Sequence, residues 1–162
     1  MSAGSMSGDV NVRRSQAIQR LPVDSVLAKL VLHNGERSDV LLFIPPGEDI
    51  TRVVSPGPPF VPMIRNAQFC LVARDVIAAL AVVVGTEPAD DEAFAIVHQR
   101  ARIALRSGVI LEGELRWISF DRHKRTSDHI NDAGTFLVLY ATEIRTTYYI
   151  VKAQIATVEE LG

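Results

Sequence analysis

The amino-acid sequence predicts an all-β protein built from two tandem five-stranded small barrels. Three observations predict this class: apolar residues alternate with a period of two, turn residues separate the short apolar runs, and the same order of signals occurs twice. The chain has 162 residues, of which 48% are hydrophobic and 22% are charged, a composition typical of a folded protein. This length suits one ordinary domain or two very small ones.

The N-terminal segment, residues 1–20, is predicted to precede the first barrel. Serine, glycine and aspartate dominate residues 1–12, which favours a flexible tail. Residues 13–20 can form a short helix, which must end before Pro22 because the residue ahead of a proline avoids the helical conformation.

The first barrel is predicted within residues 21–84. Asn34 and Gly35 form the strongest short hairpin signal, because both tolerate the positive φ that a tight two-residue turn requires. Residues 48–59 are rich in proline, glycine and charge and are predicted to be a loop. The predicted strands begin at residue 27 and continue at residues 40–44, 60–64, 69–73 and 77–84.

The acidic segment 85–95 is predicted to be the linker to the second barrel, residues 96–160. In this second half, Ser107 and Gly108 supply a turn, and residues 119–134 are predicted to be a polar loop. The predicted strands lie at residues 102–106, 111–118, 136–140, 148–151 and 155–158.

The two halves align as an internal duplication. Residues 30–35 fall on residues 103–108, and residues 72–80 fall on residues 150–158. Any two β-rich halves look alike at low stringency, but the shared order of strand, glycine turn, polar loop and later strands favours a tandem repeat. Closure of each half is predicted because a sheet this small, left open, would bury little surface and expose its edges.

Charge and composition favour no class of partner. The net charge of -2 gives no global attraction to nucleic acid or to acidic membranes. No apolar stretch approaches the ~20 residues that cross a bilayer, and residues 1–10 contain no apolar signal core. Cys70 is the one cysteine, and its apolar neighbours predict a small buried side chain. We expect a cytoplasmic protein with no membrane or DNA partner.

The sequence predicts no enzyme, no cofactor and no metal site. Histidine and aspartate cluster in one loop, but no regular element fixes the spacing of any two of them. These residues are Asp121, His123, Asp128 and His129. The chain also contains no phosphate-binding glycine loop, no dinucleotide-binding glycine fingerprint and no nucleophile elbow.

Residues 121–125 form a local basic patch with aromatic residues near it in the sequence. Basic groups neutralise phosphates and aromatic faces stack on bases, so this loop can serve as a platform for nucleic acid. The alternative is a solvated surface loop in which Arg125 and Asp128 pair with each other and Trp117 belongs to the core.

Four blocks of the second half carry a family resemblance. They are Leu105-Arg106-Ser107-Gly108, Leu111-Glu112-Gly113-Glu114-Leu115, Asp128-His129-Ile130-Asn131 and Tyr149-Ile150-Val151-Lys152. Together they cover residues 101–159 and resemble the Sm-like family, the fold of Hfq and the Sm proteins. The second half is also similar to uncharacterised bacterial Sm-like or SH3-like domains.

The resemblance implies Sm-like or SH3-type small barrels and a set of contacts to RNA or to another partner. In the Sm-like family the aspartate and asparagine of the third block lie in a base-contacting loop, and the basic residue of the last block lies in the second motif. In the first half, Arg52 corresponds to Arg125 and Arg74 to Lys152. The candidate contact residues are Arg52, Arg74, Arg122, Lys124, Arg125, Asp128, Asn131 and Lys152.

We expect a non-enzymatic interaction or assembly module that uses a protein partner or self-association through strand edges. Tyr148 and Tyr149 lie in a late predicted strand, and alternation points one ring inward and the other outward. A half-exposed aromatic ring beside an edge strand suits self-association by strand pairing. An RNA-binding Sm-like regulator is the alternative interpretation, and a small-ligand-sensing β domain is the third.

Overall fold

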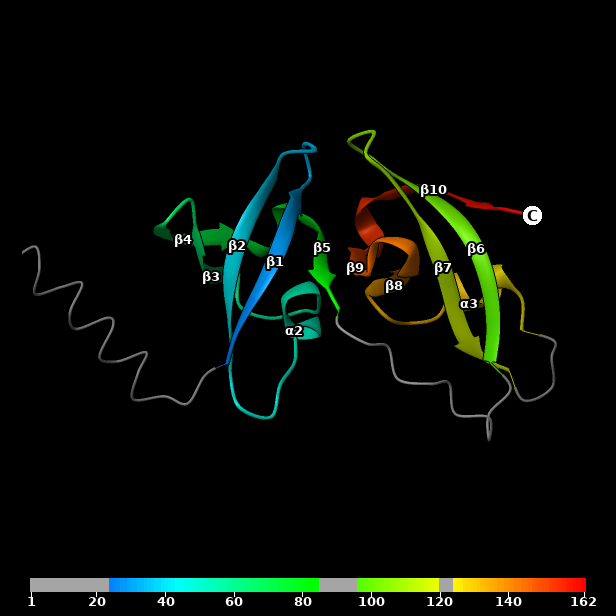
Figure 1. The fold of residues 1–162 in the computed structure, drawn as a ribbon, viewed down its shortest axis with the longest axis horizontal. Coiled ribbons are helices and arrows are strands. Elements are labelled where there is room, and N and C mark those ends of the chain that lie inside the picture. The colour runs from blue at the N-terminus through cyan, green and yellow to red at the C-terminus, as the bar shows by residue number, and fades with distance from the viewer. Residues whose placement is uncertain (1–23, 85–95, 120–123) are drawn as a thin grey trace, which may run out of the picture.

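The computed structural model describes residues 24–84, 96–119 and 124–162, and Figure 1 shows their arrangement. Within these residues ten antiparallel strands form one sheet, which confirms the prediction of an all-β protein. The predicted tail and helix of residues 1–20 and the predicted linker 85–95 lie outside the described residues.

The first half contains β-strands, one helical turn of α type and one 3₁₀ turn. Its elements are β1 (Asp24–Leu32), β2 (Arg37–Ile44), α2 (Thr51–Val54), β3 (Phe60–Arg65), β4 (Gln68–Ala73), η1 (Arg74–Val76) and β5 (Ile77–Val83). The predicted hairpin joins β1 to β2. Its Gly35 has a φ of +89°, and the Asn34 side chain accepts the N–H of Glu36.

The second half repeats this series of elements and adds a 3₁₀ turn before its fourth strand. The elements are β6 (Ile96–Leu105), β7 (Ile110–Ile118), α3 (Thr126–Ile130), β8 (Phe136–Ala141), η2 (Thr142–Ile144), β9 (Thr146–Val151), η3 (Lys152–Gln154) and β10 (Ile155–Glu160). The hairpin between β6 and β7 turns at Gly108, whose φ is +95°. The turn glycines of the two halves therefore share one conformation.

The strands lie in the order β10-β6-β7-β8-β9-β5-β1-β2-β3-β4. Within each half, the fifth strand in the sequence lies beside the first strand, and the second, third and fourth strands follow in order. The halves join through β5 and β9, where Leu80 lies opposite Tyr149 and Ala81 lies opposite Tyr148. Two closed barrels are not confirmed, because within the described residues the sheet is open and ends at β4 and β10. Among these residues neither half closes into a barrel of its own, because β5 and β9 form backbone hydrogen bonds with each other across the two halves.

The strand that carries Tyr148 and Tyr149 is not an edge, contrary to the sequence-based expectation. β9 pairs with β8 on one side and with β5 on the other. Tyr149 packs against the core of the first half, and Tyr148 packs against the core of the second half. Alternation places the two rings on opposite faces of β9, but both are half-buried, so neither points outward to solvent as predicted. Alternation alone does not reveal which strands lie beside a residue.

Buried side chains form clusters on both sides of the junction between the halves. β5 contributes to each, because Leu80 belongs to the cluster of the first half and Ala79 belongs to that of the second. Fully buried members in the first half include Leu30, Leu42, Met63 and Ile77, and those in the second half include Ile103, Leu115, Leu139 and Ile150. The junction is therefore packed on both faces.

Short helices occur in the segments 48–59 and 119–134, which were predicted to be loops. In α2, Val53 and Val54 are buried, and the Ser55 hydroxyl donates to the carbonyl of Thr51 at 2.7 Å. One helical turn is too short to show an apolar period, and tertiary burial rather than propensity stabilises it. Nowhere in the described ranges is a helix long and apolar enough to cross a membrane.

The hairpin turns of the two halves meet, as the top of Figure 1 shows. A Cβ atom at Gly35 would lie 3.4 Å from the Cβ of Ser107 and 3.5 Å from a methyl group of Val109. The β1–β2 hairpin and the β6–β7 hairpin thus touch at their tips while β5 and β9 pair between them. This arrangement leaves a cleft between the halves.

Candidate functional site

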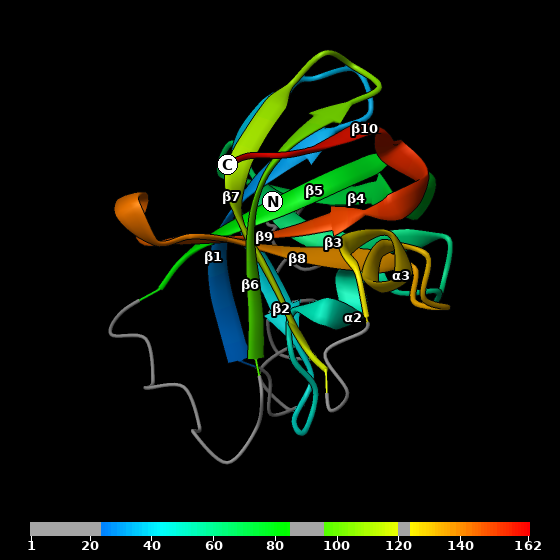
Figure 2. The ribbon, with the colours of Figure 1, turned by 90° about the vertical axis from the view of Figure 1, so that its right-hand side faces the viewer.

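The predicted contact residues gather around the two short helices. Those at α3 are Lys124, Arg125, Asp128, Asn131 and Lys152, and those at α2 are Arg52 and Arg74. Arg122 lies outside the described residues. Figure 2 shows α2 and α3 on the same side of the molecule. The loop after α3 reaches α2 through Thr135, whose hydroxyl donates to the carbonyl of Val54 at 3.4 Å.

The polar side chains at α3 bond to their own loop. Lys124 Nζ lies 2.6 Å from a carboxylate oxygen of Asp132, and Lys152 Nζ donates to the carbonyl of Asp132 at 2.9 Å. The hydrogen bond from Lys124 is the main cause that lowers the pKa of Asp132. At the start of α3, the Asp128 carboxylate accepts the N–H of Arg125 at 2.8 Å. These contacts fold the loop onto itself.

Trp117 anchors this loop to the sheet. Its indole is buried and stacks on the ring of His129, with the ring centroids 5.0 Å apart and the planes inclined by 18°. The indole N–H donates to the carbonyl of Lys124 at 3.1 Å. Burial, and then the charge of Lys124, lowers the pKa of His129, which favours the neutral imidazole. One face of the only tryptophan is therefore covered by the protein itself.

Arg74 organises the loop around α2. Its Nη1 donates to the carbonyls of Arg52, Val53 and Ser55 at 2.8, 2.9 and 2.8 Å, and its Nε donates to the carbonyl of Pro58 at 2.7 Å. Burial, with a smaller effect from Arg52, lowers the pKa of Arg74. Carbonyl groups at the end of a helix lack partners within the helix, and a guanidinium supplies several donors in one plane.

Arg74 and Lys152, which the repeat aligned, hold equivalent positions. Each is the first residue of the 3₁₀ turn before the last strand of its half. The backbone N–H of Arg74 donates to Pro59, and that of Lys152 donates to Thr135, in each case just before the third strand. Both side chains also donate to carbonyls of the loop that follows the short helix. This equivalence supports a structural role for the positively charged side chain at this position of each half.

The ends of the sheet form a second candidate site. β4 pairs only with β3 and β10 pairs only with β6 among the described strands, so each strand has a side without a strand neighbour. On β4, Leu71 is 57% exposed and Phe69 is also exposed, whereas Cys70 is half-buried and not buried as predicted. An apolar edge strand is a site where another strand can add.

The edge strand β10 differs from β4 in charge. Glu159 and Glu160 lie on it, and Glu159 accepts a hydrogen bond from Arg102 at 3.0 Å. The sequence-based prediction placed an edge strand at Tyr148 and none at residues 69–72, although these residues form an apolar run in the edge strand β4. An apolar run predicts a strand, but it does not show whether both sides of that strand are paired.

Groups of at least three histidine, cysteine, aspartate or glutamate side chains that could hold a metal ion are absent from the described residues. No protein-family model, no curated protein and no solved structure matches the chain. The candidate sites are therefore the ends of the sheet and the surface around α2 and α3, as the geometry of this chain defines them.

Proposed function

We propose that this chain is a non-enzymatic assembly module, built from two Sm-like repeats, that joins copies of itself end to end. In this proposal β4 of one copy pairs with β10 of the next. The observation that carries the proposal is the junction inside the chain, where the fourth strand of one half, β9, pairs with the fifth strand of the other, β5. β4 and β10 are the remaining fourth and fifth strands.

The internal register predicts the register between copies. The repeat aligns β4 with β9, so Leu71 corresponds to Tyr149, and it aligns β10 with β5, so Val158 corresponds to Leu80. Inside the chain Leu80 lies opposite Tyr149. Between copies, Val158 should therefore lie opposite Leu71, and by the same step Glu159 should lie opposite Cys70.

Burial of exposed apolar surface favours this pairing. Phe60 and Leu71 are exposed on the adjacent strands β3 and β4, and each has 57% of its surface accessible. Removal of apolar surface from water contributes about 25 cal/mol per Å². The contact is heterologous because it joins two different edges, and repetition of such a contact gives a ring or a filament.

A mixing experiment with two edge variants tests the proposal. Leu71→Lys places a charge on β4, and Val158→Lys places one on β10, so each variant should lose one of the two edges. Light scattering after gel filtration should give a mass above the 17.8 kDa of one chain for the wild type and a monomer for each variant alone. An equimolar mixture should form a one-to-one pair, since each variant retains the edge that the other lacks.

The matched control is Ile118→Lys, which changes an exposed side chain on the interior strand β7 and should assemble like the wild type. Circular dichroism verifies the fold of each variant. A wild type that stays monomeric at high concentration would contradict the proposal. So would a Val158→Lys dimer, because that result indicates pairing of β4 with β4.

RNA binding, which the resemblance also implies, is not favoured by a specific observation in the described residues. Lys124 and Lys152 bond to Asp132, and Asp128 bonds to the backbone of Arg125. These contacts support a structural role for the loop around α3. We therefore base the proposed function on the edges of the sheet.

A further inference from the structure

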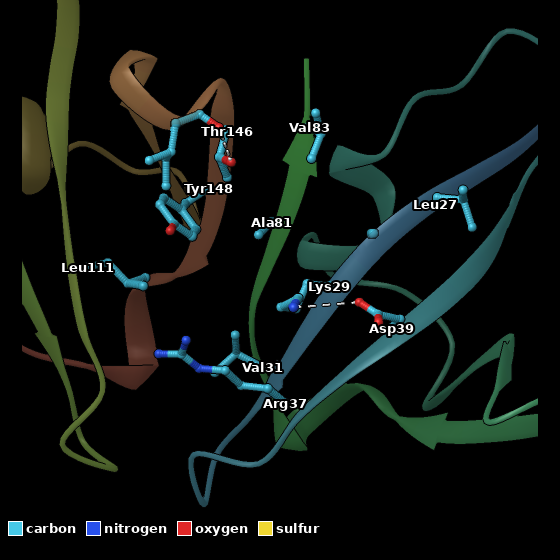
Figure 3. Close-up of a pocket in the computed structure, with 12 residues that line it drawn as sticks. Leu27, Lys29, Val31, Arg37, Asp39, Ala81, Val83, Leu111, Thr146 and Tyr148 are labelled. Carbon is cyan, nitrogen blue, oxygen red and sulfur yellow. Dashed lines mark hydrogen bonds and ion pairs between the residues drawn. The ribbon is translucent and has the colours of Figure 1, made fainter. Parts of the chain in front are cut away.

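A cleft of about 830 Å³ lies on one face of the sheet where the two halves meet, and Figure 3 shows the side chains around it. The β1–β2 hairpin forms one wall, and β7 with the segment before β9 forms the other. β5 and β9 form the floor. The volume falls within the range of roughly 300–1,000 Å³ that is usual for small-molecule sites.

The cleft is hollow because an alanine stands at the centre of its floor. The strand register places Ala81 directly between Lys29 on β1 and Tyr148 on β9. A methyl group between two long side chains leaves the space above it empty. The rim is aliphatic, since Leu27 and Val83 are 75% and 78% exposed. Exposed aliphatic side chains gathered around one cleft indicate a binding surface.

The equivalent face of the second half carries different side chains, although its strands repeat the same pairing. There Arg102 corresponds to Lys29 and Glu159 corresponds to Ala81. Arg102 donates to Glu159 at 3.0 Å and to Glu112 at 3.1 Å, so ion pairs cover that face. The small side chain of Ala81 thus stands where the second half carries Glu159. The second half also contributes to the lining of the cleft, through Leu111, Ile144 and Tyr148.

Arg37 supplies the charge of the cleft. Figure 3 shows its side chain extending from β2 toward Leu111 on the opposite wall. Among the described residues Arg37 has no hydrogen bond or ion pair, whereas Lys29 lies 3.7 Å from the carboxylate of Asp39. A guanidinium binds a carboxylate through two parallel hydrogen bonds. The free cation beside an aliphatic rim is complementary to an anion carried on an apolar body.

We propose that this cleft binds a small amphiphilic carboxylate, with its carboxylate on Arg37 and its hydrocarbon part over Ala81 and against Leu27 and Val83. This site is separate from the edges β4 and β10. Ligand binding therefore does not depend on the proposed assembly, and either can be tested without the other.

Calorimetric titration with decanoate below its micellar concentration tests this inference. The titration uses the Leu71→Lys chain, which leaves the cleft unchanged and removes the proposed association edge. Decanoate should bind saturably, with one molecule per chain. Acetate, which lacks the hydrocarbon chain, and decyltrimethylammonium, which carries the opposite charge, should each bind at least about tenfold more weakly.

Two substitutions separate the contributions of charge and shape. Arg37→Gln should weaken decanoate binding by about tenfold or more, because it removes the charged donor pair. Ala81→Leu should abolish binding by filling the floor, while Ala133→Leu adds the same side chain at an exposed position outside the cleft and should leave binding unchanged. Equal affinity for decanoate and decyltrimethylammonium, or unchanged binding after Arg37→Gln, would overturn the inference.

Discussion

Gly113→Val should lower the free energy of unfolding by about 3 kcal/mol, the upper part of the range for overpacked sites. Gly113 lies on β7 where β8 passes close to it. A Cβ atom there would lie 2.7 Å from the carbonyl oxygen of Tyr140 and 2.9 Å from Cγ of Leu139. The backbone of β8 cannot retreat freely, because β8 also pairs with β9. The added side chain must therefore open the contact between β7 and β8.

Thermal and denaturant unfolding followed by circular dichroism measure this effect. A loss of about 3 kcal/mol corresponds to a decrease in Tm of about 6–12 °C for a chain of this length. Gly134→Ala is the matched control, because its Cβ would meet only the carbonyl of Phe136, at 3.8 Å. Equal stability of the Gly113→Val and Gly134→Ala proteins would contradict the close approach of β8 to β7 at Gly113.

Arg74→Ala should destabilise the fold by about 2–3 kcal/mol, because charged hydrogen bonds disappear and partly buried carbonyl groups lose their donor. The acceptors are the carbonyls of Arg52, Val53, Ser55 and Pro58. Arg74→Lys should recover part of the loss, since an ammonium can reach fewer of these acceptors than a planar guanidinium.

The same unfolding measurements include Arg37→Ala as the control, which removes an exposed arginine whose side chain makes no hydrogen bond or ion pair within the described part of the chain. Its stability should match that of the wild type. Arg74 was first singled out as a contact to RNA or to a partner. If the Arg74→Ala protein were as stable as the wild type, Arg74 would not stabilise the α2 loop, and its predicted role as a contact residue would again be favoured.

Local signals in the sequence predicted the strands and turns well. Asn34 and Gly35 were predicted to form a hairpin, and a hairpin joins β1 to β2 there, with a positive φ at Gly35 but not at Asn34. The alignment of Arg74 with Lys152 also anticipated equivalent positions in the two halves. These features depend on residues close in the sequence, which is why a single chain suffices to predict them.

Pairing between distant strands was beyond the reach of these signals. Alternation shows that a strand has two different faces, but it contains no information on which strand lies at each edge. The strand of Tyr148 was therefore placed at an edge, although it is the one that joins the halves. β4, where Cys70 was predicted to be buried, lies at the end of the sheet.

The candidate sites show a second limit of prediction from sequence, which concerns side-chain contacts. A lysine or arginine in a loop suggests a phosphate contact, but the sequence does not show that Lys124 already meets Asp132. Conversely, Ala81 carries no chemical signal of its own. Its significance comes from its position between Lys29 and Tyr148, which only the register of the assembled sheet reveals.

Disulfide formation in a Glu159→Cys chain tests end-to-end assembly most directly. Residues directly opposite in antiparallel strands have Cα atoms about 4.5–5.5 Å apart, which suits a disulfide. Under mild oxidation, the proposed register predicts covalent chains linked between Cys70 and the introduced thiol of the next copy. Glu143→Cys, at an exposed position away from both edges, should link far more slowly. Equal rates in the two variants, or Cys70 of the wild type linking to itself, would contradict the pairing of β4 with β10.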